Sequence, residues 1–447
     1  MAMRPEREEI PCGDPFMAIW PEREETPCGD PFMAIRPERE ETMIQIAILG
    51  YGTVGSGVAE VLNRNRDVID RRAGEEIRIK YVLDLRDFPG DPIQEKIVHD
   101  YEVIVNDPEI RVVVEVMGGV NPAYDFVKRA LLAGKSVCTS NKELVAQHGV
   151  ELLDIAMKQK VNFLFEASCG GGIPIIRPMV TSLSGDVIDE ISGILNGTTN
   201  YILSEMAAEG AEFDVVLKEA QEHGYAERNP AADVEGYDAC RKIAILSSLA
   251  YGKNVDFQDI HTEGITKISS ADIKYANAWG ASIKLLATSR MVDGRAYAMV
   301  SPIMLNANDP LYSVNGVFNA IFVHADMLGD AMFYGRGAGK LPTATAVVGD
   351  VVEAVRHPHD GDMMGWSSEK LELADYRELE FRFFVRMKGS FTESLDKVEE
   401  VFGNIDAKVL AQVSGEFGFI TEKMTEAQYL EKAAHFDNIL GMIRVRF

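Results

Sequence analysis

The chain has 447 residues, of which 46% are hydrophobic, enough to bury large cores in two or three domains. Its formal net charge of −25 argues against nucleic acid and anionic membranes as partners, because both bind concentrated lysine and arginine. No apolar run reaches the roughly 18 residues of a membrane helix and no secretory signal is evident, so we expect a cytoplasmic protein. The five cysteines show neither a CxxC pair nor a metal-ligand spacing with histidine, which predicts free thiols.

The first 42 residues are repetitive. The segment RPEREEIPCGDPFMAI (4–19) recurs as WPEREETPCGDPFMAI (20–35) and begins again at residue 36. Each full unit contains three prolines, which fit neither a helix nor a paired strand, and too few apolar residues to bury a face. We therefore predict a disordered repeat tail over 1–42, which includes Cys12 and Cys28, and a folded protein that begins at Met43.

A strand, a glycine-rich turn and a helix are predicted over 43–62, MIQIAILGYGTVGSGVAEVL. In this context the pattern Gly50-x-Gly52-x-x-Gly55 indicates a dinucleotide-binding fold. The first glycine permits a tight turn, the second lets the backbone approach a pyrophosphate, and the third lets helix and strand pack closely. We assign Thr53 and Val54 of the same turn to cofactor binding as well.

A second predicted strand, IRIKYVLD (77–84), ends at Asp84. Its carboxylate would accept hydrogen bonds from the adenosine ribose of NAD, whereas Arg86 would hold the additional phosphate of NADP. The sequence therefore leaves both cofactors open.

The next predicted elements are a strand (111–119), a helix (121–135) and a strand (136–142). Strands that alternate with helices predict a doubly wound parallel sheet, with ligands beyond the carboxyl ends of the strands. The residues expected near the nicotinamide are Gly118, Gly119, Thr139, Asn141 and Lys142. A lysine at the first position of a helix opposes the helix dipole, so Lys142 is expected to have a compensating, functional role.

A cluster of charged residues lies in GYAERNPAADVEGYDACRK (224–242), directly before the apolar run 243–252. Acids at a helix start, and the spacing of Asp238 and Lys242, are explained by helix stabilisation alone. However, a helix that enters a core places these groups at the boundary of the interior, where shifted pKa values are expected. The segment is therefore also a candidate site. Its four carboxylates are those of Glu227, Asp233, Glu235 and Asp238, and it ends in the pair Arg241 and Lys242.

Another candidate turn is ILNGTTNYI (194–202). It places Asn196, Gly197, Thr198 and Thr199 between a predicted strand and a predicted helix. Backbone N–H groups and hydroxyls at such a turn either bind a carboxylate or a nicotinamide, or only cap the helix.

At this point the sequence resembles the homoserine dehydrogenases, over nearly all of 43–350. The motifs that carry the resemblance are GYGTVG (50–55), VVVEVMGG (112–119), TSNKELVA (139–146), FEASCGGGIPII (165–176), GILNGTTNYIL (193–203), DVEGYDACRK (233–242) and GRGAGKLPTATAVVGD (335–350). The resemblance implies the reversible, NAD(P)-dependent oxidation of L-homoserine to L-aspartate 4-semialdehyde, a step toward threonine, methionine and isoleucine. It also implies a homodimer or higher homo-oligomer, and it assigns Gly337 to the cofactor.

The resemblance assigns roles to the charged cluster. The lysine that matches Lys242 takes up and returns the hydroxyl proton, and the lysine that matches Lys142 lies close to the same oxygen. A neighbouring cation and partial burial are each expected to lower the pKa of such a lysine. Arg241 is expected to face solvent and Glu235 receives no role. The residues assigned to the substrate are Glu227, Asp233, Asp238, Asn196, Gly197 and Thr198.

The segment FEASCGGGIP (165–174) resembles the family's loop for a monovalent cation, Na⁺ or K⁺. Its three consecutive glycines allow carbonyl groups to converge on one point. Cys169 stands where the family usually has an apolar residue. The implied ligands are the carbonyl oxygens of Glu166, Cys169, Gly171 and Ile173.

Two other functions are compatible with parts of the pattern. An aspartate-semialdehyde dehydrogenase or a related enzyme would need a cysteine nucleophile with a histidine base, and neither Cys138 nor Cys169 has a histidine within its motif. A nucleotide-sensing regulatory protein would keep the glycine turn without the downstream lysines and acids, which are all present here.

The last segments read as strand (379–387), helix (392–406), strands (408–414 and 417–424), helix (426–436) and strand (438–447). This order resembles an ACT domain, a small regulatory module that binds amino acids. The turn from Met387 to Ser390 lacks the acid and the proline that the family commonly has there, so we expect threonine to inhibit weakly or not at all. The predicted domains are 43–165 (NAD(P)-binding), 166–338 (catalytic and dimerisation), 339–360 (return to the nucleotide domain) and 378–447 (ACT-like).

Overall fold

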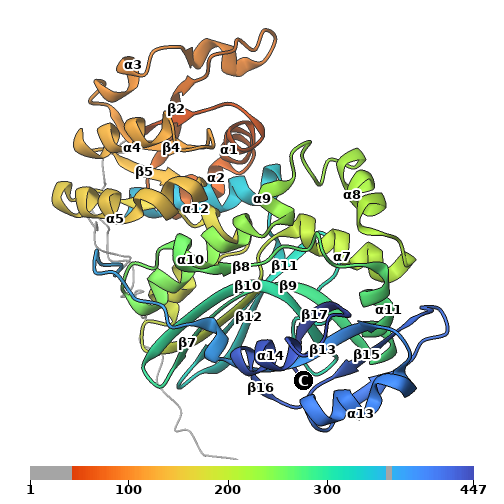
Figure 1. Cartoon of the computed structure of the whole chain (residues 1–447). Helices are drawn as coiled ribbons and strands as arrows, with labels where there is room; N and C mark the ends of the chain where they lie inside the picture. Colours follow the sequence, from red (N-terminus) through yellow and green to blue (C-terminus); the bar gives the residue numbers. More distant parts are fainter. Residues whose placement is uncertain (1–42, 359–364) are drawn as a thin grey trace, which may run out of the picture. The chain divides into compact units, whose positions relative to one another are not determined.

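The computed structural model describes residues 43–358 and 365–447 (Figure 1). The predicted repeat tail, with Cys12 and Cys28, and the end of the predicted return segment lie outside these ranges. Within them, no helix combines the length and the apolar character needed to cross a membrane.

Six parallel strands form the first sheet, in the order β3-β2-β1-β4-β5-β6. The strands are β1 (Met43–Leu49), β2 (Glu76–Leu83), β3 (Ile97–Val98), β4 (Ile110–Glu115), β5 (Ser136–Thr139) and β6 (Phe163–Leu164). The helices between them are α1 (Thr53–Arg64), α2 (Arg66–Ala73), α3 (Glu102–Val105), α4 (Ala123–Leu132) and α5 (Lys142–Gln159). This strand order is the dinucleotide-binding one, which confirms the predicted doubly wound sheet.

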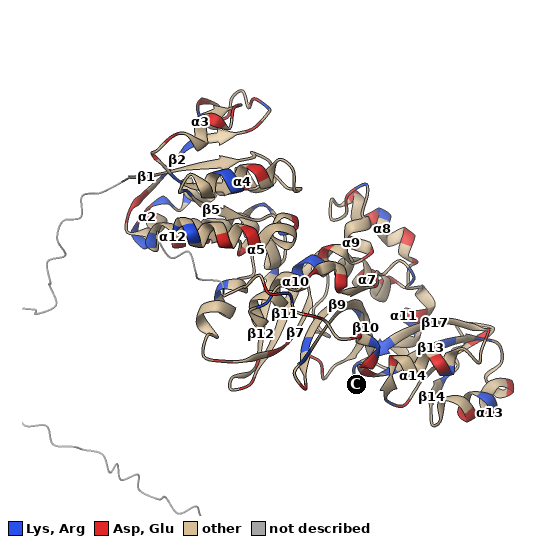
Figure 2. Ribbon diagram, turned by 60° about the vertical axis from the view of Figure 1, so that its left-hand side comes forward, with Lys and Arg blue, Asp and Glu red and all other residues tan. Residues whose placement is uncertain are grey.

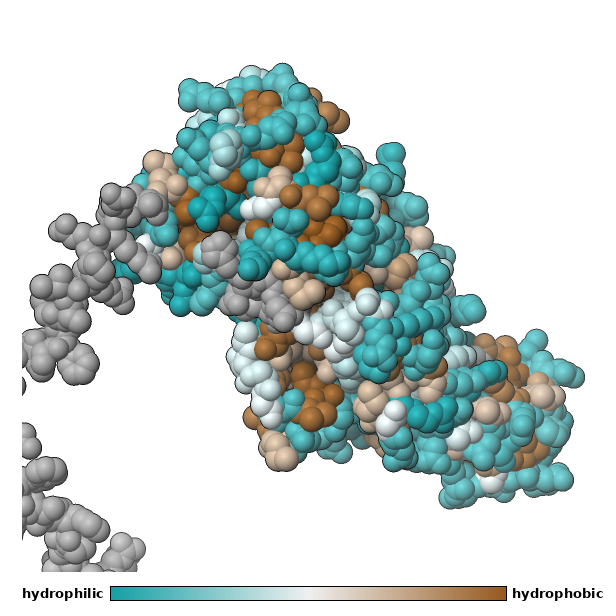
Figure 3. Space-filling model, turned by 90° about the vertical axis from the view of Figure 1, so that its left-hand side faces the viewer, coloured by the Kyte–Doolittle hydropathy of each residue, from teal (hydrophilic) through white to brown (hydrophobic). Residues whose placement is uncertain are grey.

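The central strands of this sheet are buried on both faces. Ile46–Leu49 of β1 and Val113–Val114 of β4 have no exposed surface, which is why the sequence reads there as apolar runs rather than as alternation. Charged residues occur along the helices, including α4, α5 and α12 (Lys340–Arg356), as the red and blue parts of the ribbon in Figure 2 show. Figure 3 accordingly shows a mostly hydrophilic surface with separate hydrophobic patches.

Helix α12 returns to the parallel sheet from late in the sequence. A Cβ built on Gly57 of α1 would lie 2.7 Å from the carbonyl oxygen of Lys340, so the two helices approach closely at a position where only glycine fits. Val347, Val348 and Val351 of α12 are buried in the same core as β1 and β4.

A second, mixed sheet has the order β12-β11-β7-β9-β10-β17-β13-β15-β14 along its main path. Its first five strands pair in antiparallel fashion and are β7 (Ile188–Ile194), β9 (Ala281–Val292), β10 (Arg295–Asn306), β11 (Phe318–Ala325) and β12 (Gly329–Arg336). Strand β8 (His261–Thr262) pairs in parallel with β10. The helices of this region are α6 (Ala167–Gly170), α7 (Gly197–Glu209), α8 (Phe213–Glu222), α9 (Ala231–Val234), α10 (Tyr237–Tyr251) and α11 (Ser270–Ala278).

The C-terminal region has the order strand, helix, three strands, helix and strand, which differs from the prediction by the additional two-residue strand β16. Its elements are β13 (Glu380–Lys388), α13 (Phe391–Phe402), β14 (Asp406–Lys408), β15 (Glu416–Ile420), β16 (Met424–Thr425), α14 (Glu426–Ala433) and β17 (Ile439–Val445). The prediction of a strand over 408–414 was wrong: β14 ends at Lys408 and a turn follows. The helix predicted to reach residue 406 ends at Phe402, because Gly403 takes a positive φ of 84° there.

The C-terminal strands continue the second sheet. Strand β17 pairs in parallel with β10, at Ile303 with Arg444 and at Met304 with Val445. This joint sheet was not predicted, because a pairing between segments so far apart in the sequence leaves no local pattern.

Candidate active site

The glycine-rich turn has the geometry of a pyrophosphate cradle. Gly50 has a φ of +96° and its N–H donates to the carbonyl oxygen of Leu83 at 2.8 Å. A Cβ on Gly55 would lie 2.0 Å from the Gly50 oxygen, whereas a Cβ on Gly52 would meet no atom within 4 Å. Gly52 is the N-cap of α1, so the open space lies at the positive end of that helix. Thr53 follows as its first residue.

A cavity of about 480 Å³ lies on one side of this turn. It is lined by Gly50, Gly52, Leu83, Asp84, Leu85, Arg86, His99, Tyr101, Val116, Met117, Pro122 and Phe126. The Asp84 carboxylate accepts the N–H of Tyr51 at 2.8 Å and the Arg86 Nε and Nη2 at 3.0 Å. The hydrogen bond from Arg86 is the main reason why the pKa of Asp84 is far below its ordinary value. Both residues assigned to the adenosine end of the cofactor thus lie at one cavity.

The ends of β4 and β5 are tied together by side chains. Thr139 Oγ1 donates to the carboxylate of Glu115 at 2.6 Å and accepts the N–H of Asn141 at 2.9 Å. The Asn141 amide donates to the carbonyl oxygen of Gly119 at 2.6 Å. Glu115 is fully buried, and burial raises its pKa. Thr139 and Asn141 therefore shape the strand ends. Gly118, with a φ of +83°, has no atom near its Cβ position and leaves the adjoining space open.

A second cavity, of about 460 Å³, borders the first turn of α1 at Val54. It brings together Lys142, Lys242, Asp233, Asp238, Asn196, Gly197, Thr198, Val54, Gly171 and Gly337 of the predicted residues. It is also lined by Ser140, Ala167, Ser168, Gly224, Tyr225, Val317, Arg336, Ala338, Gly339 and Thr343. Residues from separate parts of the chain thus converge beyond the carboxyl ends of the parallel strands.

The centre of this cavity is a carboxylate shared by two lysines. The Asp238 oxygens lie 2.8 Å from Lys142 Nζ and 2.7 Å from Lys242 Nζ. Asp238 and Lys242 are one turn apart on α10, with side chains only 4% and 9% exposed, whereas Lys142 reaches in from the first turn of α5 and is 37% exposed. Lys242 also donates to the carbonyl oxygen of Leu195 at 2.7 Å. The lysine at the start of α5 is thus compensated by an acid from another helix.

Asn196 links the two acids of the cavity. Its Nδ2 donates to Asp233 at 2.7 Å and to Asp238 at 2.9 Å, and its Oδ1 caps α7 by accepting the Thr199 N–H at 2.8 Å. The Thr198 hydroxyl donates to the carbonyl oxygen of Tyr225. The turn is therefore both a helix cap and a wall of the cavity.

The pKa of Lys142 is shifted in the direction opposite to the expected one. Burial acts to lower the pKa of Lys142, but the Asp238 carboxylate outweighs it and the net shift is upward, so the predicted lowering is wrong for this lysine. The pKa of Asp238 is far below its ordinary value, because Lys242 and Lys142 outweigh its burial. Burial raises the pKa of Asp233. At neutral pH Lys142 is therefore an ammonium paired with an ionised Asp238.

Some residues of the charged cluster lie elsewhere. Glu227 is on an exposed segment and does not line the cavity, and Glu235 is outside it as well. Arg241 does not simply face solvent: its side chain is 21% exposed, pairs with Glu143 at 3.6 Å and lies over the ring of Phe257. The sequence placed these residues close along the chain, but the break between α8 and α9 separates Glu227 from Asp233.

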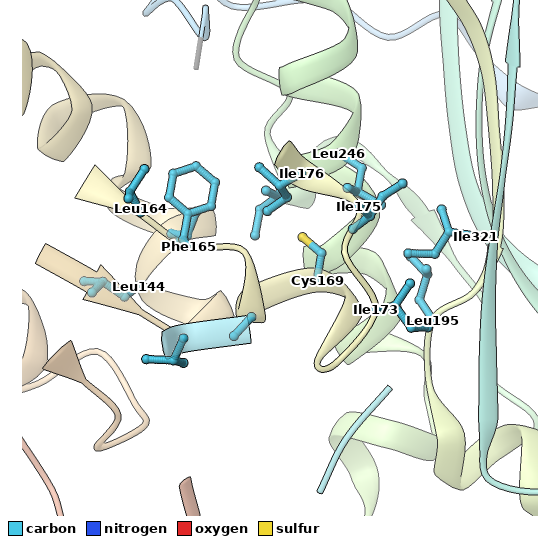
Figure 4. Close-up of a cluster of buried hydrophobic side chains, with 14 of the residues drawn as sticks. Leu144, Leu164, Phe165, Cys169, Ile173, Ile175, Ile176, Leu195, Leu246 and Ile321 are labelled. Atoms are coloured by element: carbon cyan, nitrogen blue, oxygen red, sulfur yellow. The ribbon is translucent and has the colours of Figure 1, made fainter. Parts of the chain in front are cut away.

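Cys169 lies in an apolar cluster, among Phe165, Ile175, Ile176 and Leu246 (Figure 4). Burial raises its pKa to about 12. The pKa values of Cys138 and Cys240 are also raised by burial. The cysteines of the described ranges are thus poor nucleophiles at neutral pH, which argues against a thioester mechanism.

The predicted cation loop is held rigidly. The Glu166 carboxylate accepts three backbone N–H groups, from Ile175, Ile176 and Arg177, at 2.6–2.8 Å. Gly171 has a φ of +57°, and a Cβ there would lie 2.1 Å from the carbonyl oxygen of Gly337. The loop therefore packs directly on Gly337 of the GRG motif (335–337), and Arg336 and Gly337 of this motif line the second cavity.

Three features define an oxidoreductase of the nicotinamide-dinucleotide class. They are the glycine turn, the hydrogen bonds that join the ends of β4 and β5, and the two lysines that share the Asp238 carboxylate. Comparison with protein families agrees: residues 50–166 match the model "Homoserine dehydrogenase, NAD binding domain" and residues 174–352 match "Homoserine dehydrogenase".

Individual relatives give the same result. The homoserine dehydrogenase of Synechocystis sp. is 46% identical over 322 residues, which cover 70% of this chain and 73% of the relative. The crystal structure of the Thiobacillus denitrificans homoserine dehydrogenase superposes with a TM-score of 0.84 at 35% identity, over 91% of this chain and 98% of that one. A hyperthermophilic archaeal homoserine dehydrogenase in complex with NADPH has a TM-score of 0.59 at 27% identity, over 70% and 98% of the two chains. The chain belongs to the homoserine dehydrogenase family and is an NAD(P)-dependent oxidoreductase.

Two contributors to the site were missed in the sequence. Glu115 was recognisable as one acid at the end of an apolar run, VVVEV, where a buried charge needs partners. Arg336 lines the second cavity and lies in the GRG motif, but only the folded structure brings this motif to the lysines.

Proposed function

We propose that the protein interconverts L-homoserine and L-aspartate 4-semialdehyde, with Lys242 as the proton carrier. The observation that carries this assignment is the Asp238 carboxylate shared by Lys242 and Lys142, inside the cavity that borders the α1 N-terminus. When bound, NAD(P) supplies the hydride acceptor in one direction and the hydride donor in the other. Gly50, Gly52 and Gly55 would hold its pyrophosphate, and Asp84 with Arg86 its adenosine end.

Lys242 performs the proton transfer in both directions. Oxidation of a primary alcohol to an aldehyde releases the hydroxyl proton, which the neutral amine takes up, and reduction of the aldehyde returns it from the ammonium. Its bond to the carbonyl oxygen of Leu195 and its pairing with Asp238 hold Nζ in one place. One group therefore serves the reaction in both directions.

Lys142 supports the same oxygen electrostatically. Because Asp238 raises its pKa, Lys142 remains an ammonium at neutral pH. A fixed positive charge stabilises the negative charge that develops on the oxygen in the transition state. Asp238 is engaged on both oxygens by the two lysines, so its role is to position them.

Asp233 then binds the ammonium group of the substrate. This carboxylate is oriented by Asn196 and borders the cavity, and it has no lysine partner within ion-pairing distance in the described ranges. The N-terminus of α7, at Gly197 and Thr198, is suited to the substrate carboxylate through its N–H groups. Glu227 lies outside the cavity, and its assignment to the substrate stays a prediction.

The decisive assay is the change in absorbance at 340 nm with L-homoserine and each nicotinamide cofactor. We expect turnover in both directions. Tight cofactor binding without turnover would instead support the nucleotide-sensing function.

The cofactor preference depends on the pair of Asp84 and Arg86. For Arg86→Ala we expect the ratio of kcat/KM for NADP to that for NAD to fall about tenfold or more, in line with the roughly 1.5–3 kcal/mol of a hydrogen bond to a charged group. The variant removes the cation for the additional phosphate and leaves Asp84 without the guanidinium that now neutralises it, so both changes disfavour NADP. An unchanged ratio in initial-rate assays with the two cofactors would show that Arg86 does not discriminate.

We also propose that a monovalent cation binds the carbonyl oxygens of Glu166, Cys169, Gly171 and Ile173. The positive φ of Gly171 and the rigid anchoring of Glu166 support this assignment.

If the loop binds this cation, turnover in tetramethylammonium buffer should rise severalfold and saturably on addition of Na⁺ or K⁺ at millimolar concentration. Choline chloride at matched ionic strength is the control. Equal activation by choline would show a general salt effect and remove the cation from the mechanism.

The C-terminal region is proposed to be ACT-like, and the protein to form a homodimer or higher homo-oligomer. The strand order β17-β13-β15-β14 supports the ACT-like assignment, as does the βαββαβ order of the elements without the short strand β16, which lies off the main path of the sheet. Under the same proposal, the segments 43–165, 166–338 and 339–360 act as the nucleotide, catalytic and return parts.

Threonine is expected to be a poor inhibitor. Strand β13 ends at Lys388, and the turn that follows has Gly389 and Ser390 but no acid for the ligand's ammonium. An unpaired ammonium costs a few kcal/mol, or about a hundredfold in affinity. Millimolar threonine should leave the initial rate of homoserine oxidation within about twofold. Strong inhibition of the full chain would show that another carboxylate meets this ammonium.

A further inference from the structure

A buried arginine, Arg444, joins the C-terminal region to the catalytic region. Arg444 on β17 is 1% exposed and donates to two carboxylates, to Glu426 of α14 at 2.7 Å and to Glu263 at 2.8 Å. Glu426 belongs to the C-terminal region, whereas Glu263 directly follows β8 of the catalytic region. The guanidinium therefore clamps a catalytic segment to the C-terminal strands.

The segment that carries Glu263 lies against the helix of Asp233. Strands β8 and β17 pair with neighbouring stretches of β10, so residues 261–265 and Arg444 lie beside one another. Glu263 is fixed to β10 by its N–H, which donates to the carbonyl oxygen of Val300 at 2.8 Å. We call residues 262–265 the strap.

Contact between the strap and α9 leaves no free space. The Ile265 N–H donates to the carbonyl oxygen of Val234 at 2.8 Å. A Cβ on Gly264 would lie 2.2 Å from that same oxygen and 2.5 Å from Glu235 Cα. On the other side, a Cβ on Gly236 would meet Thr262 Cγ2 at 3.2 Å. A shift of the strap therefore displaces the backbone of residues 234–236, which directly follows Asp233.

We propose that Arg444 is a positioning residue for homoserine binding: by clamping Glu263 it fixes the strap, and the strap fixes Asp233 in the substrate cavity. The inference rests on the proposed role of Asp233 in binding the substrate ammonium. The C-terminal region is then part of the substrate site's framework, although none of its residues lines the cavity.

The first test is Glu263→Gln, which weakens the clamp while Arg444 keeps Glu426. We expect KM for homoserine to rise roughly two- to thirtyfold, the range of couplings of 0.5–2 kcal/mol, with KM for the cofactor and kcat within about twofold. Arg444→Lys should act in the same direction, because an ammonium lacks the planar fork that holds both carboxylates.

Asp309→Asn is the matched control. Arg446 joins the C-terminal and catalytic regions through Asp309 at 3.2 Å and Glu190 at 3.2 Å, so this variant also removes one of two carboxylate partners, but away from the strap. We expect KM for homoserine to stay unchanged. An equal rise in Asp309→Asn and Glu263→Gln would overturn the inference, because it would show a general effect of weaker docking.

A double-variant cycle separates this inference from the proposed function. Asp233→Asn alone should raise KM for homoserine, and an unchanged KM would refute the role of Asp233 itself. If that variant raises KM, Glu263→Gln should add little in its background, because both changes act through the same carboxylate. Additive effects, or a normal KM in Glu263→Gln alone, would overturn the inference while leaving the proposed function intact.

Discussion

Lys242→Ala should lower kcat by about 10²- to 10⁴-fold while leaving cofactor affinity nearly unchanged, the usual consequence of losing a general acid–base group. The lysine lines the second cavity, whereas the glycine turn and the first cavity are formed by other residues. Steady-state kinetics and a cofactor titration by fluorescence measure the two quantities separately. Retention of more than about a tenth of the wild-type rate would exclude Lys242 as the proton carrier.

Two further measurements distinguish proton transfer from a structural role. Small primary amines should partly restore turnover in Lys242→Ala, with an efficiency that follows the amine pKa, because they supply the missing base. Arg241→Ala is the matched control, since the neighbouring side chain pairs with Glu143 outside the cavity, and we expect its kcat to remain within about threefold of wild type.

Asp238→Asn should lower kcat by roughly 10²- to 10³-fold, comparable to the loss of a positioned charge in other active sites. The amide keeps the shape of the side chain but leaves two lysines without their shared counter-ion. Because Asp238 raises the pKa of Lys142, its removal lowers that pKa, and Lys142 then loses its positive charge at a lower pH. The alkaline limb of semialdehyde reduction should therefore move to lower pH.

The pH profile of kcat checks this expectation, with Glu235→Gln as the control. Glu235 is a carboxylate three residues earlier that lies outside the cavity, so its neutralisation should leave both rate and profile unchanged. An Asp238→Asn enzyme with a normal kcat would show that this carboxylate does not position the two lysines for catalysis. Thermal unfolding should also occur at lower temperature, because breaking a buried ion pair costs about 3–5 kcal/mol.

The sequence predicted those features that depend on interactions between residues close together in the chain. The strand, the glycine spacing and the helix over 43–62 had one reasonable interpretation, because Gly50 and Gly55 are required by backbone geometry. Lys142 was singled out because it opposes the dipole of the helix that it begins. Both arguments use interactions within a few residues of the chain.

The remaining features depend on contacts between distant segments. One carboxylate holds both lysines only because α5 and α10 meet, and this contact reversed the expected direction of the Lys142 pKa. Glu227 was assigned to the substrate together with Asp233 and Asp238, yet in the folded structure it lies on an exposed segment. The pairing of β17 with β10 likewise had no local signal.

That pairing has a consequence for how the chain tolerates shortening. Ile303 and Met304 of β10 are buried, and their backbone groups are covered by the C-terminal strand on this side. A chain that stopped after Tyr376 would expose an apolar strand edge, which is a template for pairing with other molecules. Such a truncation would yield aggregated protein rather than an enzyme free of regulation. The last strand therefore protects the solubility of the enzyme, whatever ligand the C-terminal region binds.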